Sequence, residues 1–538
     1  MAFDTGLGSM ASIFQFRAGS TTAMLFQTFT IFAVLVGFSR FLESAFRARK
    51  LPPGPPRLAS LLMGMMPSST PPWKALGALS RRYGPVTSLY RGSKLVVVLG
   101  TLKAATEFLE KKGGIYSSRP RNILVGEILS RNLRGVIMPY GKRWRNWRTL
   151  MQAGLGIESS NKYKTVQSFE SSILLHDLLN EENPKRYSAH FRRFAISVVF
   201  CVGYGRRIKY LDDPLVVKNQ NATECFTRLS APGYLVESWP ILLKLPRRLQ
   251  WFAQDAYKQR ELDKEMCVDI WNEVKKNVEA GTAMPSISKR ALEKQDEFGL
   301  DDLELAYGVS APFGAGVVTT LATLDFILVA LLNYPDIMRK VQAEIDNIVG
   351  RSRLPDFCDM DSLPYTKAVI LETMRWRPIT PLGLAHASIS DDEYDKGRYI
   401  PSGTTMIPNI YAMSNDEEMF PSPEQFKPER YLEVDKANPN SPNSTFFFGF
   451  GRRICPGRHV ALNSLFIVLS RLLWTFDIVP SKDRQGNPII PDVNAIEGSF
   501  ALAPKPFSYS LQPRKDIDVK TIIQTEYEKA EDEATRWT

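Results

Sequence analysis

A cysteine loop near the C-terminal end most constrains this chain. Residues 446–458 read FFFGFGRRICPGR, and apolar residues then recur at helical spacing from Val460 to Leu473. Cys455 is therefore expected just before a helix N-terminus, whose dipole favours a thiolate. The loop predicts a single thiolate ligand in a prepared pocket. Its pattern, F-x-x-G-x-R-x-C-x-G, is formed by Phe448, Gly451, Arg453, Cys455 and Gly457.

Each neighbour of Cys455 can serve a metal-bound thiolate. Gly451 and Gly457 let the backbone bend tightly and approach a flat ligand closely. Phe448 offers an apolar face to the sulfur, and Arg453 offers a planar cation to a carboxylate. The alternative is an inert, buried thiol in a glycine-rich loop. Five fixed positions within ten residues argue against that alternative.

Composition excludes several other kinds of site. The other four cysteines lack C-x-x-C spacing, and none of the four histidines pairs with another at i, i+4. Zinc centres, disulfide frameworks and histidine-built metal sites are therefore not expected, and a reducing compartment is implied. A net charge of +11 raises the question of nucleic acid. No recognition motif accompanies the charge, so we expect no nucleic-acid partner and a basic face for an acidic electron donor or an anionic membrane.

The N-terminal region predicts a membrane anchor. Residues 23–38 are almost entirely apolar, and residues 21–41 reach the length needed for a span. Basic residues follow the segment, which favours an uncleaved anchor with a cytoplasmic body over a signal peptide or a buried core helix. Residues 51–56, LPPGPP, then predict a stiff connector.

With the anchor, the proline hinge and the cysteine loop in this order, the chain resembles the haem-thiolate monooxygenases, the cytochromes P-450, of the microsomal type. The resemblance implies a mainly α fold with a small β portion and one haem b whose iron is bound by Cys455. It divides the chain into a lead (1–20), an anchor (21–41), a basic and proline-rich hinge (42–56), a catalytic domain (57–513) and a charged tail (514–538). The tail is expected to be either a terminal helix or largely disordered.

Further residues match family positions outside the loop. Glu372 and Arg375 share a helix face as E-x-x-R, a spacing that by itself usually marks an exposed ion pair. The resemblance instead implies a structural triad of both residues with Arg430. In GKRWRNWRTLM, Trp144 and Arg148 lie four apart. The residues expected by resemblance to contact the haem propionates are Trp144, Arg148, Arg119, His386 and Arg453.

Residues 306–332 predict a long buried helix, which Gly314, Gly316 and Pro312 are expected to distort or open for a ligand. In the family this helix carries an acid followed by a threonine, both of which manage protons beside dioxygen. Val318 stands at the position of the acid, and Thr319 and Thr320 follow it. A valine cannot relay a proton. Three hypotheses stay open: the threonines order a water chain, the chemistry needs little protonation of dioxygen, or turnover is weak.

The resemblance implies an oxidoreductase that inserts one oxygen atom from O2 into a small apolar substrate, with electrons from NADPH through NADPH-cytochrome P-450 reductase. The alternative is an atypical peroxide-using, rearranging or dehydrating enzyme, or a low-activity haem-binding protein. Expected localisation is the endoplasmic reticulum membrane, single-pass, with the catalytic domain cytoplasmic. The proline hinge and the PLGLAHA segment, residues 381–387, resemble those of fungal members of the family. This resemblance favours a role in secondary-metabolite biosynthesis. Family positions place substrate contacts at residues 116–138, 232–243, 379–384 and 499–502.

Overall fold

The computed structural model describes residues 28–32, 50–57, 59–60, 70–92, 94–231, 233–395, 397–432, 445–498 and 501–537. The chain divides into two compact units, Met1–Pro52 with Asp391–Pro401, and Pro53–Ser390 with Ser402–Thr538. In the first unit, residues 28–32 are helical, and β4 (Asp392–Tyr394) pairs antiparallel with β5 (Arg398–Ile400). The rest of the expected anchor, 21–41, lies outside the described residues.

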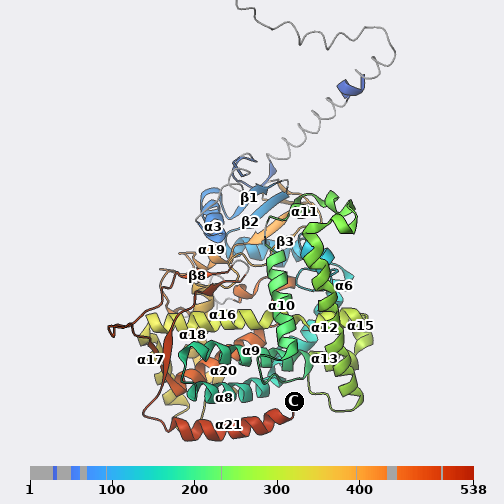
Figure 1. The fold of residues 1–538 in the computed structure, drawn as a ribbon. Helices are drawn as coiled ribbons and strands as arrows, with labels where there is room; N and C mark the ends of the chain where they lie inside the picture. The colour runs from blue at the N-terminus through green and yellow to red at the C-terminus, as the bar shows by residue number, and fades with distance from the viewer. Residues whose placement is uncertain are drawn as a thin grey trace, which may run out of the picture. The chain divides into compact units, whose positions relative to one another are not determined.

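The second unit is mainly helical, as Figure 1 shows. Helix α16 packs on α9, and α20 packs on α8. Turns of 3-10 or π type connect many of the helices. The helices are α3 (Pro72–Tyr83), α4 (Leu102–Ala105), α5 (Gly113–Tyr116), α6 (Lys142–Leu155), α7 (Ile157–Lys162), α8 (Lys164–Leu179), α9 (Tyr187–Tyr204), α10 (Pro214–Leu229), α11 (Leu235–Ser238), α12 (Gln254–Glu279), α13 (Ile287–Glu293), α14 (Gln295–Phe298), α15 (Asp302–Val309), α16 (Ala311–Asn333), α17 (Pro335–Ile348), α18 (Pro364–Trp376), α19 (Ile410–Ser414), α20 (Arg458–Thr475) and α21 (Val519–Thr535).

Short helical segments lie between the longer helices. Two of them, η1 and η2, are π-helices, a form often found at functional sites. Their bounds are η1 (Thr106–Lys111), η2 (Ile123–Leu129), η3 (Pro184–Arg186), η4 (Pro240–Lys244), η5 (Arg247–Leu249), η6 (Trp251–Ala253), η7 (Phe357–Ser362), η8 (Pro428–Tyr431), η9 (Phe446–Phe448) and η10 (Gly451–Arg453).

The sheets are small, as the sequence predicted. Strands β1 (Val86–Arg91) and β2 (Lys94–Leu99) form an antiparallel hairpin, and β2 continues in parallel to β6 (Thr405–Pro408). Strand β6 pairs in turn with β3 (His386–Ala387), which fixes the backbone at His386. The apolar end of β2 is fully buried because it is a central strand. The remaining strands are β7 (Phe476–Pro480), β8 (Ile496–Glu497), β9 (Ala503–Pro504) and β10 (Tyr509–Pro513).

The predicted long helix 306–332 consists of two helices. Helix α15 ends at Val309 and α16 begins at Ala311, so Pro312 lies in the first turn of a new helix. Proline is tolerated there because the first N–H groups of a helix have no intrahelical partner. The predicted long buried helix is therefore present, and the distortion expected near Pro312 is a break at Ser310. The predicted end before Pro335 is confirmed.

The charged tail contains a docked helix. Helix α21 packs against α8, which decides between the two forms expected for the tail. Among the described residues, Asp302–Asn333 is long and apolar enough to cross a membrane, but 67% of its most apolar window is buried inside the protein. That segment is therefore a core element of the fold.

Candidate functional site

Cys455 lies in a tightly bonded loop between η10 and α20. Its backbone N–H donates to the carbonyl of Phe448 at 2.8 Å, and α20 begins three residues later, as predicted. Burial raises the pKa of the Cys455 thiol, while the backbone N–H of Gly457 and the charges of Arg148 and Arg458 act in the opposite direction. The protein alone therefore leaves the thiol protonated, and a bound cation would convert it to thiolate.

The two glycines of the pattern have different tasks. Gly451 adopts a φ of 50°, and a Cβ atom there would lie 2.2 Å from the carbonyl oxygen of Leu109 in η1. Glycine is thus needed at position 451 because two protein segments pack closely there. The sequence predicted the close approach of a flat ligand instead. Gly457 has an ordinary φ of −84°, and the nearest atom to a Cβ there would be the sulfur of Cys455, at 4.0 Å. The side of Gly457 is therefore open next to the sulfur.

Arg453 and Arg119 are held by backbone carbonyl groups. Arg453 donates to the carbonyls of Ser117, Gly135 and Met138 at 2.7, 3.2 and 2.8 Å. Arg119 donates to three further carbonyls, two of them directly before His386. Both arginine residues are buried. The loops that precede α6 and β3 are thereby tied to the cysteine loop.

Trp144, Arg148 and His386 complete this basic cluster. The guanidinium of Arg453 stacks on the ring of Trp144 at 4.1 Å, and Arg148 Nη1 donates to the carbonyl of Ile454 at 2.6 Å. His386 Nδ1 lies 2.8 Å from the carbonyl oxygen of Tyr116. Trp144 Nε1 and Arg148 Nε are buried and have no hydrogen-bond partner within the described part of the chain. The structure therefore brings together all five residues that were expected to contact propionates.

The basic cluster carries buried positive charge that no described acidic residue neutralises. Burial lowers the pKa of Arg119 to about 10. Burial, Arg119 and Arg148 together lower the pKa of Arg453 to about 8. Burial and the charges of Arg119 and Arg453 lower the pKa of His386 to about 3. Such a cluster gains stability when carboxylates enter it.

These features match the groups of a haem. A carboxylate could accept from Trp144 Nε1 and Arg148 Nε, buried donors of this cluster that no described residue satisfies. The iron would find the sulfur of Cys455, whose raised pKa is reversed by metal binding. No group of three or more His, Cys, Asp or Glu side chains that could hold a metal occurs in the described part of the chain. The residues present therefore fit an iron porphyrin with two propionates.

Helix α16 has one exposed face within an otherwise buried helix. Gly314, Ala315 and Val318 are exposed, with 47% of Val318 accessible, while Val317 and Thr320 are buried. The Thr319 hydroxyl donates to the carbonyl of Ala315 at 2.8 Å. We call Gly314, Ala315, Val318 and Thr319 the exposed face of α16. This face is where a ligand can reach the helix.

Gly316 lies on the opposite side of α16. A Cβ atom there would come within 2.7 Å of Val199 in α9. The two glycines singled out in the sequence thus serve different surfaces, because Gly314 is exposed and Gly316 permits helix packing. Only Gly314 corresponds to the expected local opening.

Glu372, Arg375 and Arg430 meet in the interior. Arg375 forms two hydrogen bonds of 2.7 Å with the Glu372 carboxylate, and both side chains have no exposed surface. Arg430 Nε lies 3.4 Å from the same carboxylate. Arg375 also donates to the carbonyls of Ser414, Pro423 and Gln425. The three residues therefore tie α18 to the loop that leads to the cysteine loop.

Two charged features near α16 escaped the sequence analysis. Arg134 and Asp263 form a largely buried ion pair, and their separation of 129 residues left no local signal. Asp325 is a single acid within the apolar run of α16, and burial raises its pKa to about 6. A lone acid among so many apolar residues was a visible signal for the second feature.

Comparisons with known proteins agree with this geometry. The family model described as "Cytochrome P450" matches residues 52–511. The chain is 36% identical to cytochrome P450 monooxygenase 58 of Postia placenta, with 88% of this chain and 91% of the relative covered. It is also 36% identical to cytochrome P450 monooxygenase drtD of Aspergillus calidoustus, with 89% of each covered. A zebra fish cytochrome P450 solved with progesterone is 25% identical, with a TM-score of 0.70 and coverage of 83% of this chain and 100% of that chain. The chain therefore belongs to the cytochrome P450 family, the haem-thiolate monooxygenases.

Proposed function

We propose that this protein is a membrane-bound monooxygenase that inserts one oxygen atom from O2 into a small substrate, with electrons from NADPH through a cytochrome P-450 reductase. The observation that carries the proposal is the pairing of a lone cysteine loop with a buried basic cluster that lacks an acidic partner among the described residues. The bound group would be haem b, which supplies the oxygen-activating chemistry.

In this proposal each part of the site has a separate task. Cys455 would hold the iron, and Arg119, Trp144, Arg148, His386 and Arg453 would bind the propionates. Phe448 and Gly457 lie on either side of Cys455 in sequence and would shape the pocket around its sulfur. The buried triad would have a structural task, to hold α18 against the loop that leads to the cysteine loop; it consists of Glu372, Arg375 and Arg430. The catalytic domain would extend over residues 57–513, after the anchor and hinge.

The exposed face of α16 would meet O2 and substrate. Thr319 would order water there, assisted by Thr320, while the side chain of Val318 cannot hold a proton. A valine in place of the family's acid at this exposed position favours a second candidate function, in which the enzyme uses peroxide, or rearranges or dehydrates an oxidised substrate. Such chemistry needs less protonation of bound dioxygen.

An electron donor would approach the basic side of the cysteine loop. Lys142, Arg143 and Arg145 at the start of α6 are exposed, as is Arg452 in η10. Arg452 donates to the hydroxyl of Tyr140, and Arg145 lies over the same ring. An acidic flavoprotein surface would complement these charges.

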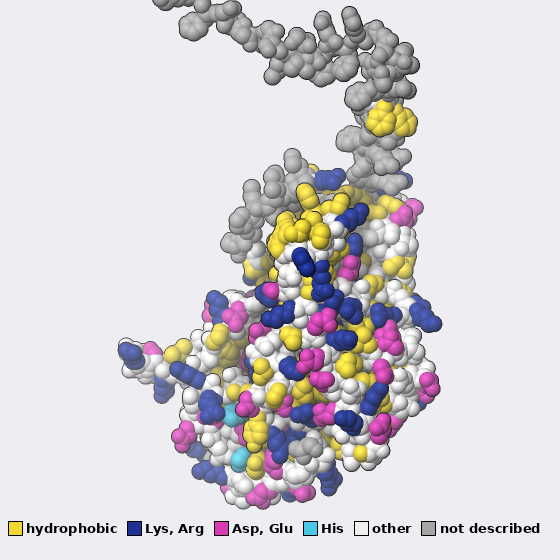
Figure 2. All heavy atoms as spheres, turned by 45° about the vertical axis from the view of Figure 1, so that its right-hand side comes forward, with side chains coloured by type: hydrophobic (Ala, Val, Ile, Leu, Met, Phe, Trp, Pro, Cys, Tyr) yellow, Lys and Arg dark blue, Asp and Glu magenta, His cyan; other side chains and the backbone are white. Residues whose placement is uncertain are grey.

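Membrane attachment rests on the apolar segment 21–41 and on a second feature. Trp239, Ile241 and Trp251, in and beside η4 and η6, are each about two-thirds exposed. Lys244, Arg247 and Arg248 are exposed between them, and Figure 2 shows hydrophobic side chains gathered beside Lys and Arg on the face toward the viewer. Aromatic and basic residues together favour the surface of an anionic bilayer. We propose residence in the endoplasmic reticulum membrane and a role in secondary-metabolite biosynthesis.

The test of function begins with the haem. The reduced, CO-treated protein should show the strongly red-shifted Soret band of thiolate ligation, and Cys455→Ser should abolish it. Cys358→Ser is the matched control, because Cys358 is an exposed thiol elsewhere in the fold. An unchanged band in Cys455→Ser would refute the assigned ligand.

Turnover distinguishes the two candidate functions. With a reductase and a panel of terpenoid, polyketide and aromatic substrates, a monooxygenase should consume NADPH and O2 and release a product with one added oxygen atom from ¹⁸O2. Product formed with peroxide but not with NADPH and O2 would favour the second function. Alkaline extraction of microsomes tests the anchor, because an integral protein stays with the pellet.

A further inference from the structure

A charged pair lies beside the exposed face of α16. Arg134, in the loop between η2 and α6, places Nη2 2.5 Å from Oδ2 of Asp263 in α12. Gln259, one turn earlier in α12, donates to the other carboxylate oxygen at 2.8 Å. The Asp263 side chain has no exposed surface, whereas 18% of the Arg134 side chain is accessible. Asp263 is thus fully occupied, and it fixes the guanidinium in place.

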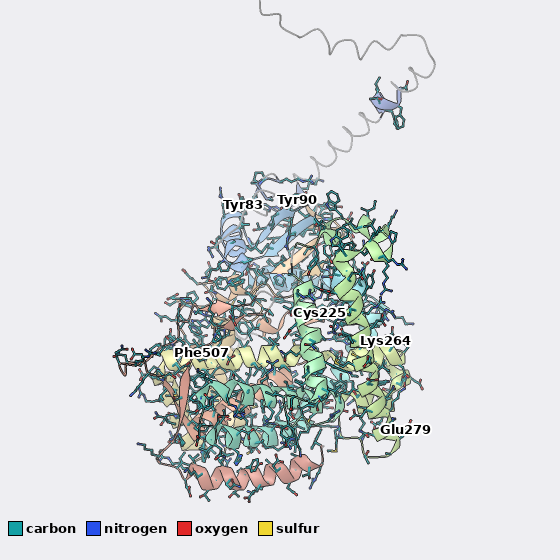
Figure 3. All side chains as sticks on the ribbon, viewed as in Figure 1. Tyr83, Tyr90, Cys225, Lys264, Glu279 and Phe507 are labelled. Carbon is teal, nitrogen blue, oxygen red and sulfur yellow. The ribbon has the colours of Figure 1, made fainter. Side chains whose placement is uncertain are left out.

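The guanidinium of Arg134 reaches α16 next to its open position. Arg134 Nη1 would lie 3.8 Å from a Cβ atom on Gly314. Among the described residues, no other atom beyond those of the neighbouring helix residues comes within 4 Å of that point. Gly314 precedes Val318 by one helical turn, so Arg134 stands at one end of the exposed face of α16. The ring of Phe226 in α10 lies 5.6 Å from the guanidinium carbon. Figure 3 marks α10 and α12 by Cys225 and Lys264.

Arg134 has N–H donors that take part in none of the described hydrogen bonds. A guanidinium carries five N–H groups, and here the described hydrogen bonds use only Nη2, toward Asp263. Nε is buried and has no partner among the described residues. A buried arginine donor without a partner is costly, unless a ligand or water accepts from it. Nη1 and Nε are therefore available to a molecule that lies along α16.

The charge balance selects the kind of acceptor. Burial opposes the charge of Arg134 most strongly, yet Asp263 more than offsets it and raises the pKa, so the guanidinium stays protonated. Arg134 and Asp263 form an ion pair of one cation and one carboxylate, which has no net charge. A substrate carboxylate would add an uncompensated negative charge in this buried region, whereas a carbonyl or hydroxyl oxygen would not.

We propose that Arg134 binds a neutral oxygen atom of the substrate, a carbonyl or a hydroxyl, and thereby orients the substrate along the exposed face of α16, with Asp263 as the positioning residue for Arg134. This inference rests on the proposed function, and it narrows the apolar substrate to an apolar skeleton that already carries an oxygen. The reaction that supplies this substrate must then either add an oxygen atom to the skeleton or leave one in place.

Imidazoles tethered to variable chains test the proposal without knowledge of the substrate. The ring nitrogen of a 1-alkylimidazole binds haem iron and shifts the Soret band. We would titrate the full-length holoprotein with series of increasing chain length that end in a methyl group, a methyl ketone or a carboxylate. At the chain length that reaches Arg134, the ketone should bind about tenfold or more tightly than the alkyl compound, as expected for a hydrogen bond to a charged donor.

Variants assign the preference to Arg134. Arg134→Met combined with Asp263→Asn removes both charges, so that no unpaired buried carboxylate remains to unfold the protein. The ketone preference should disappear while the affinity for the alkyl compound is kept. Arg228→Met with Asp255→Asn removes an exposed arginine–aspartate pair between α10 and α12, and should keep the preference.

The outcomes separate this inference from the proposed function. A normal shift with the alkyl series, but no ketone preference at any chain length, would overturn the inference alone. A preference that survives in the Arg134→Met, Asp263→Asn protein, or a carboxylate that binds most tightly, would also overturn it. If the alkyl series produced no Soret shift in the wild-type protein, the haem site itself would be refuted, and the inference with it.

Discussion

The guanidinium of Arg375 and the carboxylate of Glu372 form two hydrogen bonds of 2.7 Å without any exposed surface on either side chain. Arg375→Met should therefore leave a buried carboxylate that keeps Arg430 as a charged partner and the backbone N–H of Lys427 as a donor. We expect a loss of about 3–5 kcal/mol in the free energy of unfolding and a low haem content. Thermal unfolding and the CO-bound spectrum would measure both quantities.

The matched control is another arginine three residues after its acidic partner. Arg339 and Asp336 lie 3.0 Å apart but are 67% and 87% exposed. Arg339→Met should change stability by less than about 0.5 kcal/mol. Equal effects of the two substitutions would contradict a structural role for the buried pair.

Val318→Asp should improve the coupling of electron use to product formation. The side chain is 47% exposed, so a carboxylate can be accommodated there with access to water. If proton delivery limits turnover, the acid should raise product formed per NADPH consumed severalfold. Val318→Asn, of similar size but without a proton to give, should not. Tight coupling in the wild-type protein and no gain in the variant would rule out this limitation.

Asp325 should make the fold less stable as the pH rises. Burial raises its pKa to about 6, above the value of about 4 for an unfolded chain. The folded state therefore holds the proton more tightly, and this contribution to stability is complete below about pH 4 and lost as the pH rises through about 6. Asp325→Asn should thus be more stable than the wild type at about pH 7.5, by up to about 3 kcal/mol, and the gain should shrink at about pH 5. Urea unfolding at both pH values measures this difference. Asp361→Asn, at a fully exposed site, is the control, and a gain independent of pH would contradict the assignment.

Trp537 should anchor the C-terminal helix. Its side chain is 5% exposed and faces Phe169 of α8, and its carbonyl accepts from the backbone N–H of Arg207 at 2.8 Å. Arg207 also bridges Glu170 and Glu531 at 2.9 Å each. Trp537→Ala should cost about 3–5 kcal/mol, measured by thermal unfolding. Trp239→Ala, at a position 66% exposed, should change the free energy of unfolding little. If Trp537→Ala cost no more stability than Trp239→Ala, the proposed anchoring by Trp537 would be contradicted.

The cysteine loop and its helix could be predicted because each rests on a local pattern. Cys455 precedes α20 because Gly457 is followed by a helical apolar repeat that begins at Val460. The distortion near Pro312 was expected, but its form was not, since Pro312 is equally compatible with a kinked helix and with the first turn of a new one.

Pairings between distant segments left no trace in the sequence. Arg134 and Asp263 meet only because the loop after η2 packs on α12. Likewise, the family resemblance offered propionate roles for Arg119 and Arg453, yet their backbone carbonyl partners lie in loops that no periodicity describes. The form of the tail was undecidable as well, because the apolar face of α21 is short and its stability comes from docking on α8.

The contact of Gly451 with Leu109 sets an order for assembly of the site. The two residues are separated by most of the chain, and the carbonyl oxygen of Leu109 occupies the space where any larger residue at 451 would place its Cβ atom. A nascent chain exposes η1 long before the cysteine loop is made, so the earlier segment serves as a template on which the later one closes. Capture of iron by the sulfur is thus a late event in biogenesis, and a C-terminal fragment that carried Cys455 alone would lack the surface that shapes its loop.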